Sequence, residues 1–498
     1  MNVNPITRLD YPDPDVIRVE DTYYMVSTTM HFMPGCEILQ SFDLVHWEHA
    51  TYVYETLDHT DAQQLKSGQN IYGQGMWAAS LRYHEGRFYI CFVANDTRKT
   101  YLYTSEKIDG PWKKQLIEGF YHDGSLLFDE DGRNYIVYGN DEIWITELNE
   151  DLTAPKKDGL HRLLVSDHKN PKLGYEGSHI QKINGYYYIF LIHSLRDRWM
   201  RTEACFCSDS LEGEFTGGDV LCDDRGYCGQ GVAQGGIVDT PDGKWYAMLF
   251  QDSGAVGRLP ILLPVTWKDH FPVFGQNGHV PEEIEVHSTR PGYIYQPLVG
   301  SDDFCNGLLP RWQFNHDPDP QYYHLDALQG TYTITTREVC TELTQAVNTL
   351  TQRMSYPSCA AEVTVDASAL KEGDVAGLCA FQGCYAAVGI TKHHGKYEVL
   401  MLDKKEDGIL DMTEGTVVES HQMDFRLEAD FCNMKDEARC YYRVNKGDWL
   451  PIGTVHKLYF KLDHFTGCRF GLFCYAAEET GGSACFRDFK YYDVDEIS

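Results

Sequence analysis

The chain has 498 residues, 43% of them hydrophobic, which is enough for two or three globular domains with sizeable cores. Its formal net charge of −31 argues against nucleic acid or an anionic membrane as partner, because phosphate groups are bound by clustered Lys and Arg. No apolar run is long enough to span a bilayer, and the first residues lack the apolar core of a secretory signal. The 16 cysteines are scattered and form no CxxC pair. We therefore expect reduced thiols, a cytoplasmic location and a neutral ligand such as a sugar.

A repeat organises the first three hundred residues. In each of five copies a marker residue is followed by a polar turn and then by a short aromatic segment. The marker precedes the last aromatic residue of this motif by 11 residues in the first copy and by 12 in the other four. The markers are, in chain order, Asp13, Trp77, Asp123, Glu176 and Gln234.

The aromatic segments are predicted to be strands, because they are rich in β-branched and aromatic residues and are bounded by turn signals. They cover residues 24–27, 88–93, 135–138, 186–192 and 245–250. Asp-Gly, Asn-Gly or Glu-Gly dipeptides precede four of them and indicate hairpins. The markers follow one another at intervals of 46 to 64 residues, the size of a four-stranded propeller blade with insertions. We therefore predict an all-β protein in which residues 1–297 form a five-bladed β-propeller. If each marker begins the innermost strand of its blade, all five side chains meet at the axis.

The repeat ends after Trp267, and the residues around 289–293 have the composition of a linker. Residues 298–498 alternate short strands with polar connections, which predicts a β-sandwich domain. The expected strands cover residues 331–335, 361–365, 397–402, 469–475 and 486–492. This half has no second set of carboxylates in repeated contexts, so we expect it to support the propeller. An independent carbohydrate-binding module is the alternative, and it would require exposed aromatic side chains on one face.

Three of the five markers are carboxylates, and their contexts favour acid–base chemistry. Asp13 lies in a Pro-Asp-Pro sequence that fixes the backbone, whereas Asp10 and Asp15 lack this combination of context and repeat offset. Asp123 and Glu176 are each followed by Gly, which lets a ligand approach closely. Three carboxylates at one axis repel one another, so at least one pKa should rise towards neutrality. A protonated carboxyl beside an ionised one is the arrangement that cleaves glycosidic bonds.

Trp77 offers an apolar face on which a sugar ring can stack, with a core position as the alternative. Together with the markers, the motifs of the chain resemble glycoside hydrolase family 43, the five-bladed arabinofuranosidase and β-xylosidase family. The matching stretches are Asn4-Pro5-Ile6, Pro12-Asp13-Pro14, residues 41–47, Met76-Trp77-Ala78, residues 123–126, residues 176–179 and Gly257-Arg258. The C-terminal half resembles the sandwich of two-domain, β-xylosidase-like members.

The resemblance implies a role for each matched residue. It makes Asp13 the general base that activates water, Glu176 the general acid, and Asp123 the carboxylate that orients this acid and tunes its pKa. It places Arg258 and Phe32 near the sugar in the −1 subsite. It also implies inversion in a single displacement, with the carboxyl groups of Asp13 and Glu176 roughly 6.5–9.5 Å apart.

One motif departs from the family pattern. Many members carry a His in the fifth-blade motif, near a calcium ion in the channel, and this chain has Gln234 in that place. A glutamine carbonyl can still ligate a hard cation or its water, so we expect an axial calcium near Gln234. We expect no transition-metal site, and the remaining histidines are interpreted as surface or core residues.

These observations favour an exo-acting glycosidase that removes terminal α-L-arabinofuranose or β-D-xylose from arabinoxylan-derived oligosaccharides. The oligomeric state is left open. Fructan- and sucrose-cleaving propeller enzymes are a weaker alternative, because their Asn-Asp-Pro-Asn, Arg-Asp-Pro and Glu-Cys motifs are absent from the sequence. A propeller that binds sugar without cleaving it is a second alternative, and a pH–rate profile with two limbs would exclude it.

Overall fold

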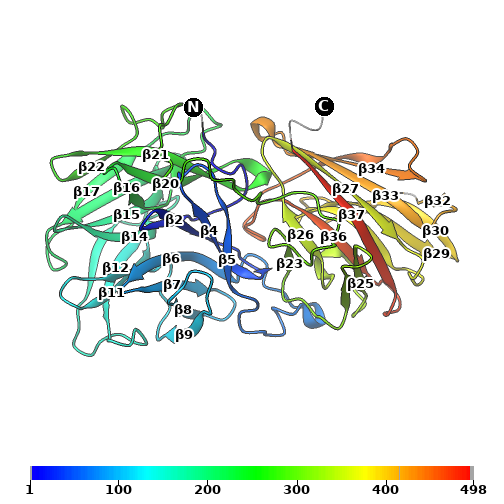
Figure 1. Cartoon of the computed structure of the whole chain (residues 1–498), viewed down its shortest axis with the longest axis horizontal. Coiled ribbons are helices and arrows are strands. Elements are labelled where there is room, and N and C mark those ends of the chain that lie inside the picture. Colours follow the sequence, from blue (N-terminus) through cyan, green and yellow to red (C-terminus); the bar gives the residue numbers. More distant parts are fainter. Residues whose placement is uncertain (1–2, 414, 494–498) are drawn as a thin grey trace.

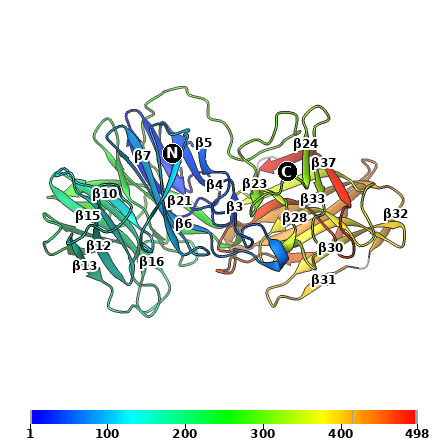
Figure 2. The same cartoon turned by 90° about the horizontal axis from the view of Figure 1, so that it is seen from below.

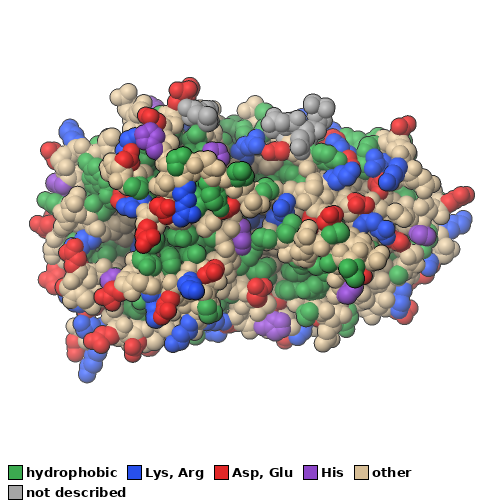
Figure 3. Space-filling view, in the orientation of Figure 1, with side chains coloured by type: hydrophobic (Ala, Val, Ile, Leu, Met, Phe, Trp, Pro, Cys, Tyr) green, Lys and Arg blue, Asp and Glu red, His purple; other side chains and the backbone are tan. Residues whose placement is uncertain are grey.

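The computed structural model describes residues 3–413 and 415–493. These residues form two all-β bodies side by side, the N-terminal one on the left of Figure 1 and the C-terminal one on the right. Apart from strands they contain four 3₁₀ turns, η1 (Lys66–Gly68), η2 (Gly254–Val256), η3 (Leu343–Gln345) and η4 (Cys432–Met434). No helix in the described ranges has the length and apolarity needed to cross a membrane. Figure 3 shows Asp and Glu side chains spread over both bodies, as the net charge requires.

Five sheets of consecutive antiparallel strands form the blades of the predicted propeller. Blade I contains β1 (Asp15–Val19), β2 (Thr22–Ser27), β4 (Gly35–Ser41) and β5 (Glu48–Tyr54), and blade II contains β6 (Met76–His84), β7 (Arg87–Ala94), β8 (Lys99–Ser105) and β9 (Lys113–Ile117). Blade III contains β10 (Ser125–Phe128), β11 (Asn134–Asn140), β12 (Glu142–Leu148) and β13 (His161–Ser166), and blade IV contains β14 (Glu176–Ile183), β15 (Tyr186–Ser194), β16 (Arg201–Ser208) and β17 (Thr216–Leu221). Blade V contains β18 (Val232–Ala233), β19 (Ile237–Asp239), β20 (Trp245–Asp252), β21 (Arg258–Lys268) and β22 (Phe271–Phe274). The predicted aromatic segments are confirmed as the second strand of blades I to IV and as β20 of blade V.

The predicted hairpins form because their turns carry residues that tolerate a left-handed backbone. Asn184 and Gly185 have φ of 51° and 84°, and Glu85 and Gly86 have φ of 47° and 77°. A two-residue turn with both φ values positive matches the twist of the flanking strands. Each turn thereby pairs the innermost strand of its blade with the aromatic strand that follows.

The N-terminal segment closes the ring of blades. The Ile6 amide donates to the Pro260 carbonyl at 2.8 Å, and the Asn4 side chain exchanges two hydrogen bonds with the backbone of Leu262. An ion pair between Arg18 of β1 and Asp239 of β19 joins blades I and V on the inner side. The residues just before β1 therefore run beside β21 of blade V.

The C-terminal body is the predicted sandwich of two sheets around one apolar core. The first sheet has the order β3 (Phe32–Met33), β23 (Gln313–Asn315), β26 (Leu350–Arg353), β36 (Arg469–Tyr475), β28 (Val375–Phe381), β29 (Ala386–His393), β30 (Lys396–Lys404) and β31 (Leu410–Met412), with β32 (Thr416–Val418) also paired to β30. The second has the order β24 (Tyr323–Asp326), β25 (Thr331–Thr335), β37 (Ser483–Asp493), β27 (Ser358–Asp366), β33 (Gln422–Asp430), β34 (Glu437–Val444) and β35 (Leu450–Lys457). The five strands expected in this half are confirmed as β25, β27, β30, β36 and β37.

The two bodies share a strand and a buried ion pair. The short strand β3 comes from the propeller half of the sequence but pairs with β23 of the sandwich, as Figure 2 shows at the junction. Arg353 of β26 donates to the Glu37 carboxylate of β4 at 2.8 Å, and its guanidinium lies 4.0 Å from the centre of the Tyr11 ring. All three side chains are buried. The residues that link the bodies, 275–312, contain the predicted boundary at 297 and pack on blade I, where the Thr289 amide donates to the Phe42 carbonyl.

Candidate active site

The five markers lie where the innermost strands begin. Trp77 and Glu176 are among the first two residues of β6 and β14, and Gln234 directly follows β18. Asp13 and Asp123 lie two residues ahead of β1 and β10. The structure therefore places all five at one end of the innermost strands.

The backbone at this end departs from regular strand geometry. Asp13, Asp123 and Gln234 adopt left-handed φ values of 53°, 48° and 64°. The register shifts after Met76 and again after Glu176, as at a β-bulge. Bulges and left-handed residues turn side chains away from the regular alternation of a strand, and they gather at functional sites. This local geometry directs the marker side chains towards one another.

Both carboxylate oxygens of Asp13 are held. Thr28 Oγ1 donates to Oδ2 at 2.7 Å, and Arg258 Nη1 donates to Oδ1 at 2.9 Å. Asp13 is 6% exposed and Arg258 2% exposed, so water screens their ion pair weakly. The carboxylate of Asp13 is thereby fixed in orientation beside a permanent positive charge.

The sandwich contributes an aromatic ring to this site. Phe465 lies in the connection between β35 and β36, and its ring centre is 4.2 Å from the Arg258 guanidinium and 6.0 Å from the Trp77 ring. Asp10 holds this arrangement together, because its Oδ1 accepts from the Arg258 amide and its Oδ2 from the Gly467 amide, both at 2.7 Å. We refer to residues 458–467 as the docking loop. The docking loop thereby brings a residue of the sandwich, Phe465, to Arg258 and Trp77 of the propeller.

The second half of the site joins Asp123, Glu176 and His122. His122 Nε2 lies 3.4 Å from Glu176 Oε2 and 3.6 Å from Asp123 Oδ2. The Gly177 amide donates to Asp123 Oδ2 at 2.9 Å, and Asn140 Nδ2 donates to Glu176 Oε2 at 2.6 Å. One polar atom from each of the first three residues lies within 4.8 Å of the others. The two carboxylates of blades III and IV therefore share one imidazole.

Two pKa values of this cluster are raised, that of the Asp123 carboxyl group and that of the His122 imidazole. Burial, together with the negative charges of Glu176 and Asp13, raises the pKa of Asp123 to about 6, although His122 acts against the rise. Burial acts against a charged His122, but Asp123 and Glu176 outweigh it and raise its pKa to about 9. The expectation that a carboxylate pKa rises towards neutrality is thus confirmed at Asp123. The raised pKa of His122 favours its protonated form beside the two carboxyl groups.

The two aromatic residues predicted from the sequence lie in different places. Trp77 is half-buried beside the carboxylates and meets His122 edge-on, with 5.7 Å between the ring centres. Phe32 is 1% exposed at the junction of the two bodies, where the Arg469 guanidinium lies 3.5 Å from its ring centre. The structure thus brings Trp77 to the cluster and packs Phe32 into the interface. A contact between Phe32 and the sugar stays a prediction.

Gln234 lies beside the cluster of Asp123, Glu176 and His122. Its side chain packs on Gly177, whose missing Cβ would stand 2.7 Å from Gln234 Cδ. The backbone amide of Gln234 donates to Glu203 Oε2 at 2.7 Å. Glu203 is fully buried, which raises its pKa well above the usual range. Glu203 Oε1 is buried without a hydrogen-bond partner among the described residues. Oxygen atoms of this kind suit calcium, so the calcium prediction stands as a proposal, and no catalytic step is derived through it.

Four residues of the site were not predicted from the sequence. His122 directly precedes the marker Asp123, and Asn140 ends the neighbouring strand β11. The position of each relative to the repeat could therefore have indicated that it lies near the markers. Thr28 follows β2 and carries only a weak local signal. Phe465 belongs to an irregular loop almost four hundred residues from Trp77 in the sequence, and no pattern in the sequence indicates its position.

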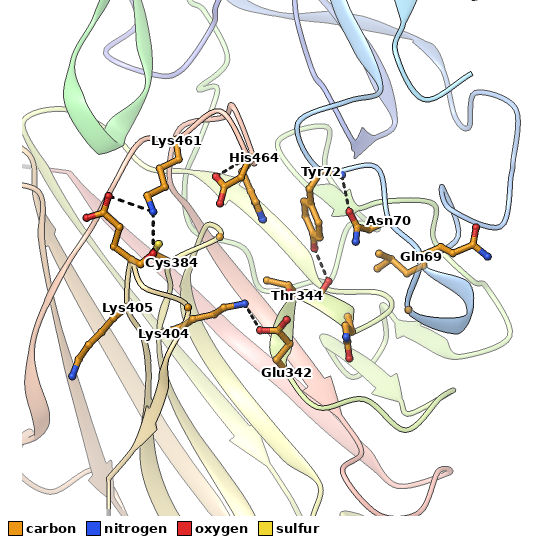
Figure 4. Close-up of a pocket in the computed structure, with 17 residues that line it drawn as sticks. Gln69, Asn70, Tyr72, Glu342, Thr344, Cys384, Lys404, Lys405, Lys461 and His464 are labelled. Carbon is orange, nitrogen blue, oxygen red and sulfur yellow. Dashed lines mark hydrogen bonds and ion pairs between the residues drawn. The ribbon is translucent and has the colours of Figure 1, made fainter. Parts of the chain in front are cut away.

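A separate cavity of about 410 Å³ lies on the other side of the docking loop, between the propeller segment 65–72 and the sandwich. Figure 4 shows Lys461, His464 and Tyr72 along one side and Lys404 and Glu342 on the opposite side. Its charges are balanced internally, since Lys404 pairs with Glu342 and Lys461 with Glu406. None of the marker residues lines it.

A five-bladed propeller with buried carboxylates at one end of its innermost strands defines a class of enzymes that cleave glycosidic bonds. Residues 3–272 match the model of glycosyl hydrolases family 43, and residues 301–492 match the β-xylosidase C-terminal concanavalin A-like domain. The chain belongs to glycosyl hydrolases family 43 and is a glycoside hydrolase.

Relatives of known name share both bodies. The chain is 26% identical to a β-xylosidase of Formosa agariphila, over 99% of this chain and 89% of the relative, and 24% identical to a xylosidase/arabinosidase of Butyrivibrio fibrisolvens, over 99% of each. Among solved structures, a bifunctional GH43-CE protein of Bacteroides eggerthii superposes with a TM-score of 0.92 at 42% identity. The match covers 99% of this chain and 64% of that chain, so this chain spans just under two thirds of its length.

Proposed function

We propose that the chain is an exo-acting, inverting glycosidase that releases terminal α-L-arabinofuranose or β-D-xylose from arabinoxylan-derived oligosaccharides. The names of its relatives support pentose as the substrate: besides those above, a Bacteroides ovatus relative, 24% identical over 82% of this chain, is called a non-reducing end α-L-arabinofuranosidase. The two sugars present similarly arranged hydroxyl groups, so one pocket can accept both. Trp77 and Phe465 offer the apolar faces on which such a ring would stack.

One observation carries the assignment of roles. Asp13 has its own guanidinium partner in Arg258, whereas Glu176 and Asp123 share His122. Carboxylates in unlike environments divide the acid and base roles between them. In this mechanism Asp13 takes a proton from water as its oxygen attacks the anomeric carbon, and Glu176 gives a proton to the departing glycosidic oxygen. A separation of roughly 6.5–9.5 Å between the two carboxyl groups is expected for such an inverting pair.

The test is hydrolysis of aryl α-L-arabinofuranoside and aryl β-D-xyloside by the wild type and by Glu176→Ala. We expect the wild type to cleave at least one of them, and Glu176→Ala to lose roughly 10²- to 10⁴-fold in kcat/KM. Glu212→Ala, which removes an exposed carboxylate from the same blade, serves as the control and should match the wild type. Proton NMR of the first-formed sugar should show the inverted anomer. A retained anomer would refute the single displacement, and an inert wild type would refute the pentosidase assignment.

A further inference from the structure

The two carboxylate oxygens of Glu176 have different surroundings. Oε2 accepts a hydrogen bond from Asn140 Nδ2 at 2.6 Å and lies 3.4 Å from His122 Nε2. Oε1 makes no hydrogen bond to any side chain or amide in the described ranges, and the side chain of Glu176 is 19% exposed. A carboxylic acid that donates its proton needs one free oxygen directed at the acceptor. The contacts leave Oε1 as that oxygen.

His122 and Asn140 form a single structural unit. The Gly139 amide donates to the His122 carbonyl at 3.0 Å, so the two residues come from neighbouring backbone segments tied together in blade III. The His122 ring is further fixed by Trp77, which it meets at an interplanar angle of 64°, and by Asp123 Oδ2 at 3.6 Å. Glu176 itself belongs to blade IV. His122 and Asn140, both of blade III, therefore contact a carboxyl group that belongs to blade IV.

We propose that His122 and Asn140 are positioning residues that clamp Oε2 of Glu176, so that Oε1 carries the proton to the leaving-group oxygen. This inference rests on the proposed role of Glu176 as general acid. As the proton leaves Oε1, the bond between the anomeric carbon and the leaving oxygen breaks, and the attacking water gives its own proton to Asp13. The negative charge that then develops on Glu176 falls on the carboxyl group that already has two donors at Oε2. Charge-assisted hydrogen bonds of this kind favour the product side of the proton transfer.

The clamp also balances the charge of the site. Asp13 is paired with Arg258, and Asp123 shares His122 with Glu176. When Glu176 holds the proton that the proposed mechanism requires, Asp13 and Asp123 each keep a nitrogen-bearing partner. Removal of His122 would leave Asp123 buried without a cation, a state that costs free energy unless the group is neutralised.

The first test is the dependence of rate on the leaving group. His122→Phe keeps a ring against Trp77 but removes the donor, and Asn140→Ala removes the other donor. A general acid matters most for a poor leaving group, so we expect kcat/KM to fall roughly 10- to 100-fold for phenyl glycosides and less than about 3-fold for 2,4-dinitrophenyl glycosides. His161→Phe in the same blade, where the histidine stacks on Trp144, is the matched control and should leave both rates unchanged. An equal loss on all leaving groups would show a merely structural role and overturn the clamp.

The second test does not depend on the substrate. A crystal structure of the His122→Phe, Asn140→Ala double variant should show the Glu176 carboxyl displaced or in several conformations. A Glu176 side chain that keeps its position in this variant would overturn the proposal. Should the wild type cleave no pentoside, the proposed substrate would be wrong, while the position of Glu176 in the variant would still decide the clamp.

Discussion

At the scale of single residues, Asp123 sets the pH response that we expect of the enzyme. Its pKa of about 6 lies above the ordinary value for Asp, so protonation occurs as the pH falls through about 6. A protonated Asp123 no longer pairs with the His122 imidazolium. We therefore expect wild-type kcat/KM to decline below about pH 6. Asp123→Asn should be slower at every pH and should lack this decline, and pH–rate profiles of the two proteins would check it. A decline at the same pH in Asp123→Asn would assign the titration to another group.

The residue scale also shows what local sequence can reveal. Asp13, Asp123 and Glu176 were predicted to meet, because a fixed offset in a repeat places equivalent positions at equivalent points of the fold. Arg258 was also expected near the site, but its bond to Asp13 was not, because that bond joins blade V to blade I and forms only when the ring closes. Thr28 escaped prediction because it lies in an irregular turn after β2. Asp10 lacks the repeat offset, yet both of its oxygens accept backbone hydrogen bonds at the edge of the site.

At the scale of elements, the docking loop couples the sandwich to the chemistry. Asp10→Asn would replace one acceptor oxygen by an amide that faces a backbone donor, either at Arg258 or at Gly467. Because the loop then loses its anchor, Phe465 and Arg258 should shift, and we expect kcat/KM to fall roughly 10- to 100-fold, chiefly through KM. Steady-state kinetics would measure this.

Leu462→Ala changes an exposed side chain of the same loop and provides the control, with wild-type kinetics expected. Phe465→Ala should resemble Asp10→Asn in its KM. If Asp10→Asn were kinetically silent while Phe465→Ala was impaired, Asp10 would not be what holds the loop in place.

Some strands could be predicted from the sequence and others could not. Strands such as β15 and β20 were predictable because aromatic residues, turn dipeptides and repeat spacing all agree. The two-residue strand β3 has no periodicity to detect, and its partner β23 lies some 280 residues away. The sandwich was proposed as a support or as a separate sugar-binding module. Its exposed large hydrophobic side chains in the described ranges, Leu328, Val339, Ile409, Met412, Val417, Leu450, Val455 and Leu462, are all aliphatic, which favours the support role.

At the scale of the whole molecule, buried charges lock the two bodies together. Arg353→Met would leave Glu37 buried without its cation, and breaking a buried pair in this way costs about 3–5 kcal/mol. We expect urea unfolding of the variant at a correspondingly lower midpoint. The double variant Arg353→Met, Glu37→Gln should recover part of the loss, because the uncompensated charge is gone. A double variant no more stable than the single one would place the cost in packing rather than in charge.

The proposed calcium ion is a second prediction at this scale. An ion beside Gln234 and Glu203 would join blades IV and V, so its binding should stabilise the folded state, by about 2.7 kcal/mol at a hundredfold excess over Kd. We expect elemental analysis to find calcium in the purified protein, and EDTA to lower its Tm. Gln234→Ala should weaken both effects. Protein free of calcium whose Tm does not respond to added calcium would refute the proposal.

The docking loop has a consequence for the order in which the enzyme is made. All three carboxylates belong to the first 176 residues of the chain, whereas Phe465 belongs to the last forty. The ribosome therefore makes the three carboxylates long before the ring of Phe465 that faces Arg258 and Trp77. The strand β3 likewise waits for β23 to emerge. The proposed site thus gains its last ring only once residues 458–467 have joined the propeller, and a product truncated before them carries the carboxylates without Phe465.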